Sequence, residues 1–204
     1  MPLIRKTSAA DAQPANGSAA KLRDGAPDER WAAARRLTAP SDVGVLTAAL
    51  AAEPDARVRE AILTSLARIG GPESAAAMIA QVRSDDAGVR TAALDGLRAM
   101  PDTADASLPA LLADGDADVR LLATELARAL PGPQATVLLC GLLDREAEPN
   151  VCAAAIDVLA EVGGPEALPA LARCGERFAA SPFLSFAIRV AAERIGAQSP
   201  DRLG

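Results

Sequence analysis

The sequence predicts an all-α fold, a right-handed α-solenoid of about five to six helical hairpins. Its 204 residues are 50% apolar but only 2% aromatic, whereas β-sandwiches and barrels are rich in β-branched and aromatic residues. The apolar positions follow helical periodicity over much of the chain. The same pattern returns about every thirty residues, a period that is typical of stacked helical repeats.

A recurring segment marks the start of each unit. Clear copies read Asp-Ala-Arg-Val-Arg-Glu-Ala from Asp55 and Glu-Pro-Asn-Val-Cys-Ala-Ala from Glu148. Apolar residues follow the valine after four, eight and eleven positions, which places them on one side of a helix. The anchors are separated by 29, 31, 30, 32 and 33 residues: Glu29, Val58, Val89, Val119, Val151 and Leu184. The units therefore start near residues 28, 56, 87, 117, 149 and 181.

A second helix completes each unit. Gly-Gly-Pro sequences at 70–72 and 163–165 end a first helix and begin the next, because glycine suits the residue after a helix and proline suits a first turn. Apolar stripes predict second helices that include residues 43–50, 78–82, 108–112, 137–143 and 168–171. An acidic loop follows, and its aspartate is placed to cap the next helix. Residues 19–23 are expected to form a remnant second helix before the first unit.

The repeated pattern, Asp-x-x-Val-Arg-x-x-Ala-x-x-x-Leu-x-x-Ile-Gly-x-Pro, resembles the short HEAT-like repeat of the phycobilisome-lyase type. The resemblance covers about residues 24–196 and is best at Val58 and Val151. It implies hairpins that share one continuous core, in a family that includes scaffolds, adaptors and a few enzymes. We therefore expect a disordered tail over residues 1–18, a repeat solenoid over 19–196 and a C-terminal tail over 197–204.

Composition excludes several kinds of chemistry. There is no histidine, so imidazole-based triads and histidine-ligated metals are excluded. The net charge of -6 disfavours nucleic acid, which needs a basic surface. No apolar run is long enough to cross a bilayer, and three widely spaced cysteines do not form a disulfide framework. We expect a cytoplasmic, bacterial protein with no catalytic residue, no metal and no cofactor.

Arginines recur at the position after the anchor: Arg30, Arg59, Arg90 and Arg120. Aspartates recur in the loops that precede the first helices: Asp55, Asp86 and Asp116. In a structural interpretation, each arginine pairs with an aspartate of its own or a neighbouring loop and ties adjacent units together. Alternatively, the arginines bind a phosphate or an acidic peptide through bidentate contacts. The resemblance makes the arginine part of the repeat signature, which favours the structural interpretation.

Two other groups of polar residues carry weaker hypotheses. The spacing of four acidic residues is similar to that of a calcium loop: Asp114, Asp116, Asp118 and Glu125. Val119 takes the position of the required glycine and begins a helix, so we interpret the segment as an acidic loop. Cys140, Cys152 and Cys174 have no histidine base to activate them, which favours inert thiols. Cys140 lies in an apolar run, and Cys174 is expected to be the more exposed thiol.

Candidate partner-binding residues lie near the two ends. Phe178, Phe183 and Phe186 either plug the open end of the core or form a docking patch. At the other end, the apolar and basic segment Leu3, Ile4, Arg5 and Lys6 is either a peptide motif for a partner or a ragged terminus. Trp31 lies off the inward stripe and is placed to pack under that segment.

These features favour a non-catalytic scaffold or adaptor for protein–protein interaction. Its partner is expected to be another protein, bound through the surface of the second helices, which is rich in alanine, serine and threonine, and through the ends. An accessory role in bacterial signalling fits the family. The protein is expected to be a monomer or a weak dimer through its C-terminal end. The alternative is a lyase-like enzyme or an enzyme-accessory chaperone that acts on another protein.

Overall fold

In the computed structural model, residues 13–198 are described, and within them every regular element is a helix. The chain divides into two compact units, Met1–Met100 and Pro101–Gly204. The first contains α1 (Gln13–Asp24), α2 (Pro27–Arg36), η1 (Pro40–Asp42), α3 (Val43–Leu50), α4 (Ala56–Ile69), α5 (Gly71–Gln81) and α6 (Ala87–Arg98). The second contains α7 (Pro101–Leu111), α8 (Ala117–Ala127), α9 (Gly132–Leu143), α10 (Pro149–Val162), η2 (Pro165–Ala167), α11 (Leu168–Arg177) and α12 (Pro182–Gln198).

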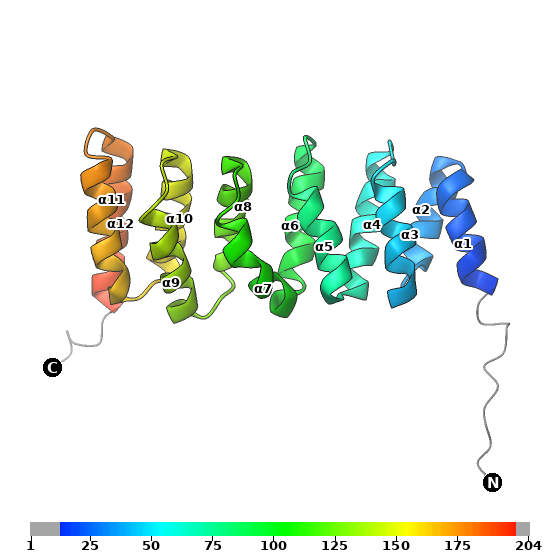
Figure 1. The fold of residues 1–204 in the computed structure, drawn as a ribbon, viewed down its shortest axis with the longest axis horizontal. Coiled ribbons are helices and arrows are strands. Elements are labelled where there is room, and N and C mark those ends of the chain that lie inside the picture. The colour runs from blue at the N-terminus through cyan, green and yellow to red at the C-terminus, as the bar shows by residue number, and fades with distance from the viewer. Residues whose placement is uncertain (1–12, 199–204) are drawn as a thin grey trace, which may run out of the picture. The chain divides into compact units, whose positions relative to one another are not determined.

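The N-terminal unit consists of two layers of helices. The first helices of the repeats, α2, α4 and α6, pack side by side, and α1, α3 and α5 form the second layer (Figure 1). Fully buried leucine, isoleucine and methionine side chains fill the space between the layers: Leu22, Leu37, Leu46, Ile62, Leu63, Leu66, Met78 and Leu97. One core therefore runs through this unit.

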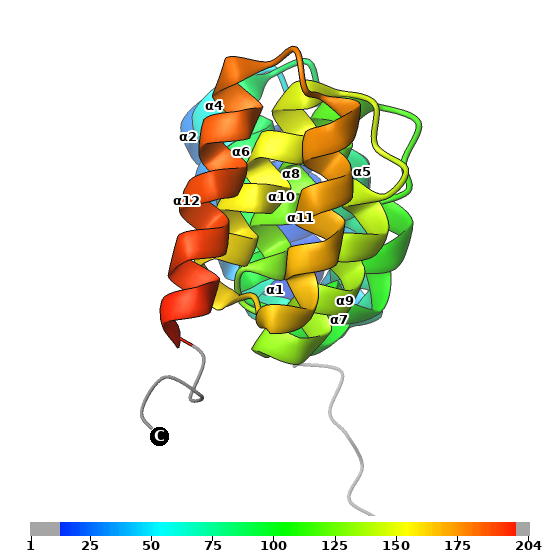
Figure 2. The ribbon, with the colours of Figure 1, turned by 90° about the vertical axis from the view of Figure 1, so that its left-hand side faces the viewer.

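The C-terminal unit repeats the arrangement. Helices α8, α10 and α12 form one layer, and α9 and α11 pack beside each other in the second layer with α7 against α8 (Figure 2). Alanines replace larger residues at several inward positions, and Ala123, Ala127 and Ala155 are almost completely buried. Small side chains at these positions let neighbouring helices approach closely.

Local sequence signals set the helix boundaries. The Asp55 carboxylate accepts hydrogen bonds from the amides of Arg57 and Val58 at the start of α4, and Asp86 does the same for Gly88 and Val89 in α6. At the turn from α4 to α5, Gly70 and Gly71 have φ values of 71° and 82°. Only glycine adopts this conformation readily, so the Gly-Gly pair fixes the tight turn.

The all-α solenoid of stacked hairpins predicted from the sequence is confirmed. The first helices begin at residues 27, 56, 87, 117, 149 and 182, within one residue of the predicted unit starts. Other boundaries differ. Residues 13–18 are helical in α1, where the sequence predicted disorder, and α12 reaches Gln198. Helices α5, α7 and α9 begin earlier than their apolar stripes, because proline in the first turn starts them before the first buried residue.

Candidate functional site

The arginine after the anchor joins two consecutive loops. In the C-terminal unit, Arg120 donates backward to the carbonyl oxygen of Asp114, at 2.8 Å. Its Nε and Nη2 atoms donate forward to both carboxylate oxygens of Glu146, at 2.7 and 2.9 Å. The Glu146 side chain is only 3% exposed and also accepts the amides of Ala147 and Glu148. The hydrogen bond from Arg120 is the largest cause of the lowered pKa of Glu146.

The N-terminal unit repeats this connection. Arg30 donates to both oxygens of Glu53, each at 2.8 Å, and to the carbonyl oxygen of Gly25. The hydrogen bond from Arg30 lowers the pKa of Glu53. Arg59 donates backward to the Glu53 carbonyl and forward to Asp86, at 2.7 Å. Arg30, Arg59 and Arg120 therefore each contact the loop before their own helix and the loop of the next repeat. We call this series the loop ladder; it consists of Arg30, Arg59, Arg90 and Arg120 with their loop acceptors.

The sequence analysis placed the aspartates as the partners of these arginines, and it missed the glutamates. Asp55 and Asp116 mainly cap helices, whereas Arg30 and Arg120 pair with Glu53 and Glu146. Both glutamates lie five residues before an anchor valine. This repeated position was the sequence signal that could have identified them as the arginine partners. Arg90 donates to the carbonyl oxygen of Ser84, which occupies the same position. These contacts support the structural interpretation of the ladder.

Cys152 replaces the ladder arginine in α10. Its Sγ atom lies 3.8 Å from the carbonyl oxygen of Glu146, and Arg177 from α11 donates to that same oxygen at 3.2 Å. Arg177 thus supplies the guanidinium that α10 lacks.

The thiols differ from the expected pattern of exposure. Cys152 and Cys174 are fully buried, and Cys140 is half-buried. The prediction that Cys174 is the exposed thiol was therefore wrong, because Cys174 continues the inward stripe of Ala170 and Leu171 in α11. The Cys174 thiol and burial raise the pKa of Cys152, and burial raises the pKa of Cys140.

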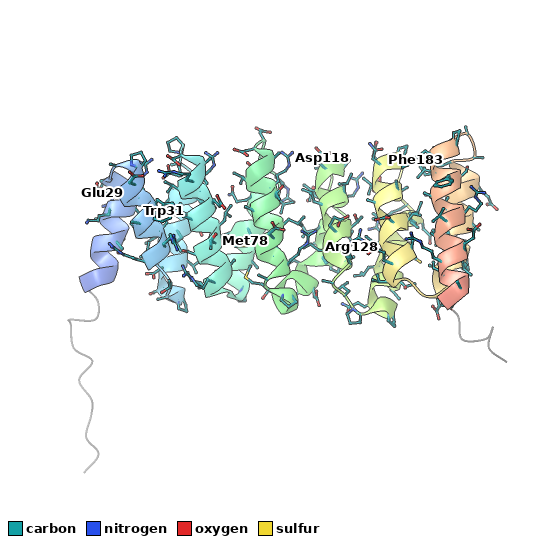
Figure 3. All side chains as sticks on the ribbon, turned by 180° about the vertical axis from the view of Figure 1, so that it is seen from behind. Glu29, Trp31, Met78, Asp118, Arg128 and Phe183 are labelled. Carbon is teal, nitrogen blue, oxygen red and sulfur yellow. The ribbon has the colours of Figure 1, made fainter. Side chains whose placement is uncertain are left out.

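A second cation, which the sequence analysis missed, also ties α8 to α10. Arg128, which follows the last residue of α8 and is labelled in Figure 3, pairs with Asp157 at 3.0 Å, with Glu161, and with Glu125 of α8. The hydrogen bond from Glu161 is the largest cause of the raised pKa of Arg128. Arg128 therefore takes part in a contact between two repeats.

Two of the three C-terminal aromatic residues are exposed. Phe183 and Phe186 on α12 are 62% and 57% exposed, whereas Leu184 on the same helix is buried. The interpretation of these rings as a plug for the core was therefore wrong, because the inward stripe of α12 passes between them. Phe178 is half-buried, with the Arg177 guanidinium 5.5 Å from its ring centroid, and Arg189 lies 5.3 Å from the Phe186 centroid.

Trp31 lies on α2, where it is 36% exposed, and the Arg35 guanidinium stacks 4.6 Å from its ring centroid. Leu3, Ile4 and Arg5, the candidate residues expected to cover it, lie outside the described residues.

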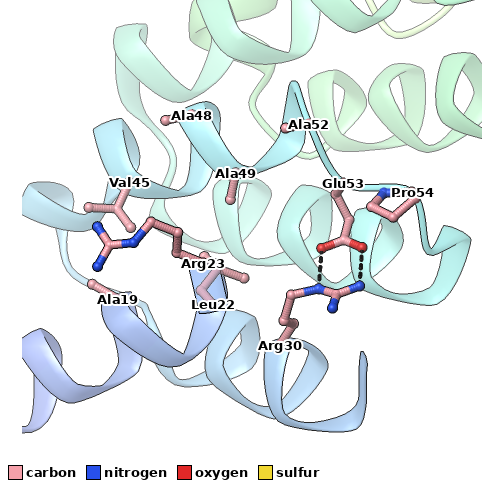
Figure 4. Close-up of a pocket in the computed structure, with 10 residues that line it drawn as sticks. All are labelled: Ala19, Leu22, Arg23, Arg30, Val45, Ala48, Ala49, Ala52, Glu53 and Pro54. Carbon is pink, nitrogen blue, oxygen red and sulfur yellow. Dashed lines mark hydrogen bonds and ion pairs between the residues drawn. The ribbon is translucent and has the colours of Figure 1, made fainter. Parts of the chain in front are cut away.

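A groove of about 450 Å³ lies between α1 and α3 on the second-helix layer (Figure 4). Small or apolar side chains line most of it: Ala19, Leu22, Val45, Ala48, Ala49, Ala52 and Pro54. The Arg30–Glu53 pair borders the groove and Arg23 lies beside Val45 in the close-up. Val45 is 38% exposed and lies off the buried stripe of α3, so its apolar side chain faces the groove.

A second, wider groove lies on the other side of α3, against α5. Its volume is about 840 Å³, and its lining includes Val43, Thr47, Ala48 and Ala76. Ala48 belongs to both grooves and forms the ridge between them. We call these two grooves and their ridge the α3 surface. Its lining is rich in alanine, as expected for the second-helix surface, but it includes a single threonine, Thr47, and no serine.

Neither a metal-binding cluster nor a membrane-spanning helix is found among the described residues. Among residues 13–198 with described side chains, no group of three or more cysteine, aspartate or glutamate side chains is arranged to hold a metal ion. Within the same part of the chain, none of the helices has both the length and the apolar character that a membrane span needs.

Layered hairpins joined by a loop ladder define the protein class as a helical-repeat solenoid. The sequence model of the HEAT repeats family matches residues 18–99 and 104–177, which is more than half of the chain. The chain therefore belongs to the HEAT repeat family. Its two matched stretches meet near the division between the two compact units, at Met100 and Pro101.

Solved structures show similarity over most of the chain. A crystal structure of an engineered protein is 19% identical, with a TM-score of 0.44 over 90% of this chain and 96% of that chain. The designed armadillo repeat protein YIII(Dq)4CqI is 18% identical, with a TM-score of 0.43 over 88% of this chain and 98% of its own. Computationally designed armadillo repeat proteins for modular peptide recognition are 18% identical, with a TM-score of 0.45 and coverage of 87% and 98%. No curated protein matches this chain.

Proposed function

We propose that this protein is a non-catalytic scaffold that binds another protein through the α3 surface. The observation that carries the proposal is the pair of grooves on the two sides of α3, which share Ala48 and leave Val45 partly exposed. Interfaces gain affinity where an apolar anchor fills a well-packed pocket and excludes water. An apolar side chain of a partner segment that crosses α3 has such a pocket on each side of the ridge.

The lining of the grooves supports this assignment on physical grounds. Alanine side chains leave space at the backbone and lose no rotamer entropy when a partner covers them. The Arg30–Glu53 pair at the border is already satisfied within the protein, so a partner does not have to compensate a buried charge. The expected contact is therefore mainly apolar at the centre, with polar groups at the rim.

An experiment on the ridge tests the proposal. The tagged protein is used to purify a partner from cells that express the protein naturally, and the affinity of the purified partner is measured by biolayer interferometry. Ala48→Glu puts a charge on the exposed ridge, and we expect it to weaken binding at least tenfold. Ala172→Glu, at an exposed alanine of α11, is the matched control and should bind like the wild type. Equal affinity of all three proteins, or the absence of any bound partner, would overturn the proposal.

The two ends are separate candidates for contact. A variant without residues 1–12 tests Leu3, Ile4 and Arg5 and leaves α1 complete. The exposed Phe183 and Phe186 support weak self-association through the C-terminal end. In sedimentation velocity, the wild type should then show concentration-dependent dimers that the double variant Phe183→Ser, Phe186→Ser lacks.

The alternative function, a lyase-like enzyme or an accessory chaperone for another protein, makes a different prediction. Thiol chemistry in such a protein requires at least one of Cys140, Cys152 and Cys174. A scaffold should bind its partner unchanged when these become alanine, alanine and serine, respectively. Loss of activity with retained folding in that triple variant would favour the alternative.

A further inference from the structure

On the first-helix layer of the N-terminal unit, a pocket of about 380 Å³ lies between α2 and α4. We call it the Trp31 pocket; its lining is Trp31, Arg35, Arg57, Glu60, Ala61, Thr64 and Arg68. It is separate from the α3 surface, which belongs to the other helical layer. Trp31 is labelled in Figure 3, in which the molecule is seen from the side opposite to that of Figure 1.

Two of its arginines are held in place by uncharged groups. Arg35 stacks on the Trp31 ring at 4.6 Å. Arg68 donates to the carbonyl oxygen of Arg35 at 3.2 Å and to Oγ of Ser65 at 3.1 Å. Ser65 itself is buried and donates to the carbonyl oxygen of Ala34 at 2.9 Å. These hydrogen bonds hold the Arg68 guanidinium in place, so the side chain loses less conformational entropy when it binds a ligand.

No carboxylate of the described residues pairs with Arg35 or Arg68, whereas Arg57 pairs with Asp28 at 2.7 Å. Glu60 is the one carboxylate among the residues that line the pocket. The Trp31 pocket is thus a local positive site on a protein with a net charge of -6.

We propose that the Trp31 pocket binds an acidic side chain of a linear peptide segment in a partner protein. The planar guanidinium of arginine matches a carboxylate in a bidentate geometry. The exposed part of the Trp31 ring offers an apolar surface for the methylene groups beside that carboxylate. Tryptophan and arginine together are also the residue types that dominate binding energy at protein interfaces.

The protein carries its own reporter for this site. Trp31 is the only tryptophan, and the chain contains no tyrosine, so fluorescence excited near 295 nm comes from this pocket alone. The titrant is the peptide acetyl-Ala-Glu-Leu-Glu-Glu-Ala-amide, and its control has glutamine in place of each glutamate. We expect a saturable change with the acidic peptide that weakens several-fold with added salt, and no saturable change with the glutamine peptide.

Variants assign the effect to particular residues. Arg68→Gln should weaken binding of the acidic peptide at least tenfold, whereas Arg68→Lys, which keeps the charge but loses the planar fork, should show a smaller loss. Arg36→Gln is the matched control, because Arg36 is exposed on the same helix as Trp31 but does not line the pocket. Thermal unfolding of each variant shows whether it keeps the fold.

Several results would overturn the proposal. These are the same response to both peptides, no saturable response, or an equal loss for Arg36→Gln and Arg68→Gln. Inorganic phosphate that competes at the same concentration as the peptide would show a general anion site instead of a peptide site. Ala48→Glu should leave this titration unchanged, so failure of the Trp31 pocket and failure of the α3 surface are distinguishable.

Discussion

Replacement of Glu146 by alanine tests the loop ladder at its most buried position. The substitution removes both carboxylate acceptors of Arg120, which keeps its backward bonds to backbone carbonyls, and it removes the acceptor of the amides of Ala147 and Glu148. It leaves the Arg120 guanidinium, which is 16% exposed, without its carboxylate. Removal of one partner from a buried ion pair costs about 3–5 kcal/mol, mostly because the remaining charge is uncompensated. We expect a loss of free energy of unfolding in this range for Glu146→Ala.

The repeat supplies a matched control at Ser84, which occupies the same loop position. Its Oγ atom accepts the amide of Asp86, at 3.2 Å, so Ser84→Ala should cost about 1 kcal/mol, the net value of one hydrogen bond. Urea denaturation followed by circular dichroism at 222 nm measures both variants. If Glu146→Ala loses no more stability than Ser84→Ala, the forward contact of the ladder does not stabilise the fold, and the reasoning fails.

Three further predictions concern packing and pH. A Cβ atom at Gly96 would collide with Sδ and Cε of Met78, whose side chain is fully buried and must move within the core to make room. Gly96→Ala should therefore destabilise the N-terminal unit by about 1–3 kcal/mol through overpacking, as measured by urea denaturation. Nothing lies within 4 Å of a Cβ at Gly196, so Gly196→Ala should raise the stability by about 0.4–1 kcal/mol in the same assay, and a loss would contradict the open space. The pKa values of Glu53 and Glu146 are lowered from the ordinary 4.5, so their contribution to stability is present above that pH and is lost as the pH falls below it. The melting temperature should drop in this acidic range, with a shallower drop for Glu146→Gln; parallel curves for the two proteins would exclude the ion pair as the cause.

The fold could be predicted from the sequence because its signals are local and repeated. The aspartate that caps α4 and the Gly70–Gly71 turn that ends α4 lie within one repeat, and similar signals recur in other repeats. The start of α1 was missed, since its first residues carry polar and small side chains without an apolar stripe. Such a helix cannot be predicted from its local composition.

The candidate sites depend on contacts between neighbouring repeats, which the periodicity of the sequence does not specify. The Arg30–Glu53 pair joins residues 23 positions apart, and their pairing depends on which loops face each other. The sequence left two interpretations of Phe183 and Phe186 open, because a pattern of apolar residues does not tell which face of the last helix is covered. The α3 surface was expected from its alanine content, whereas the Trp31 pocket needed Arg68 from the next repeat.

The loop ladder gives the chain a polarity. Arg30, Arg59 and Arg120 each donate to the loop of the repeat that follows, so these repeats depend on their successors for an acceptor. The last step lacks both members: Cys152 replaces the donor, and residues 178–181 before α12 contain no carboxylate. Repeats of this protein are therefore not freely interchangeable modules. A chimera that inserts or exchanges a repeat has to match donor and acceptor across each junction, and an array extended beyond α12 would need both restored together.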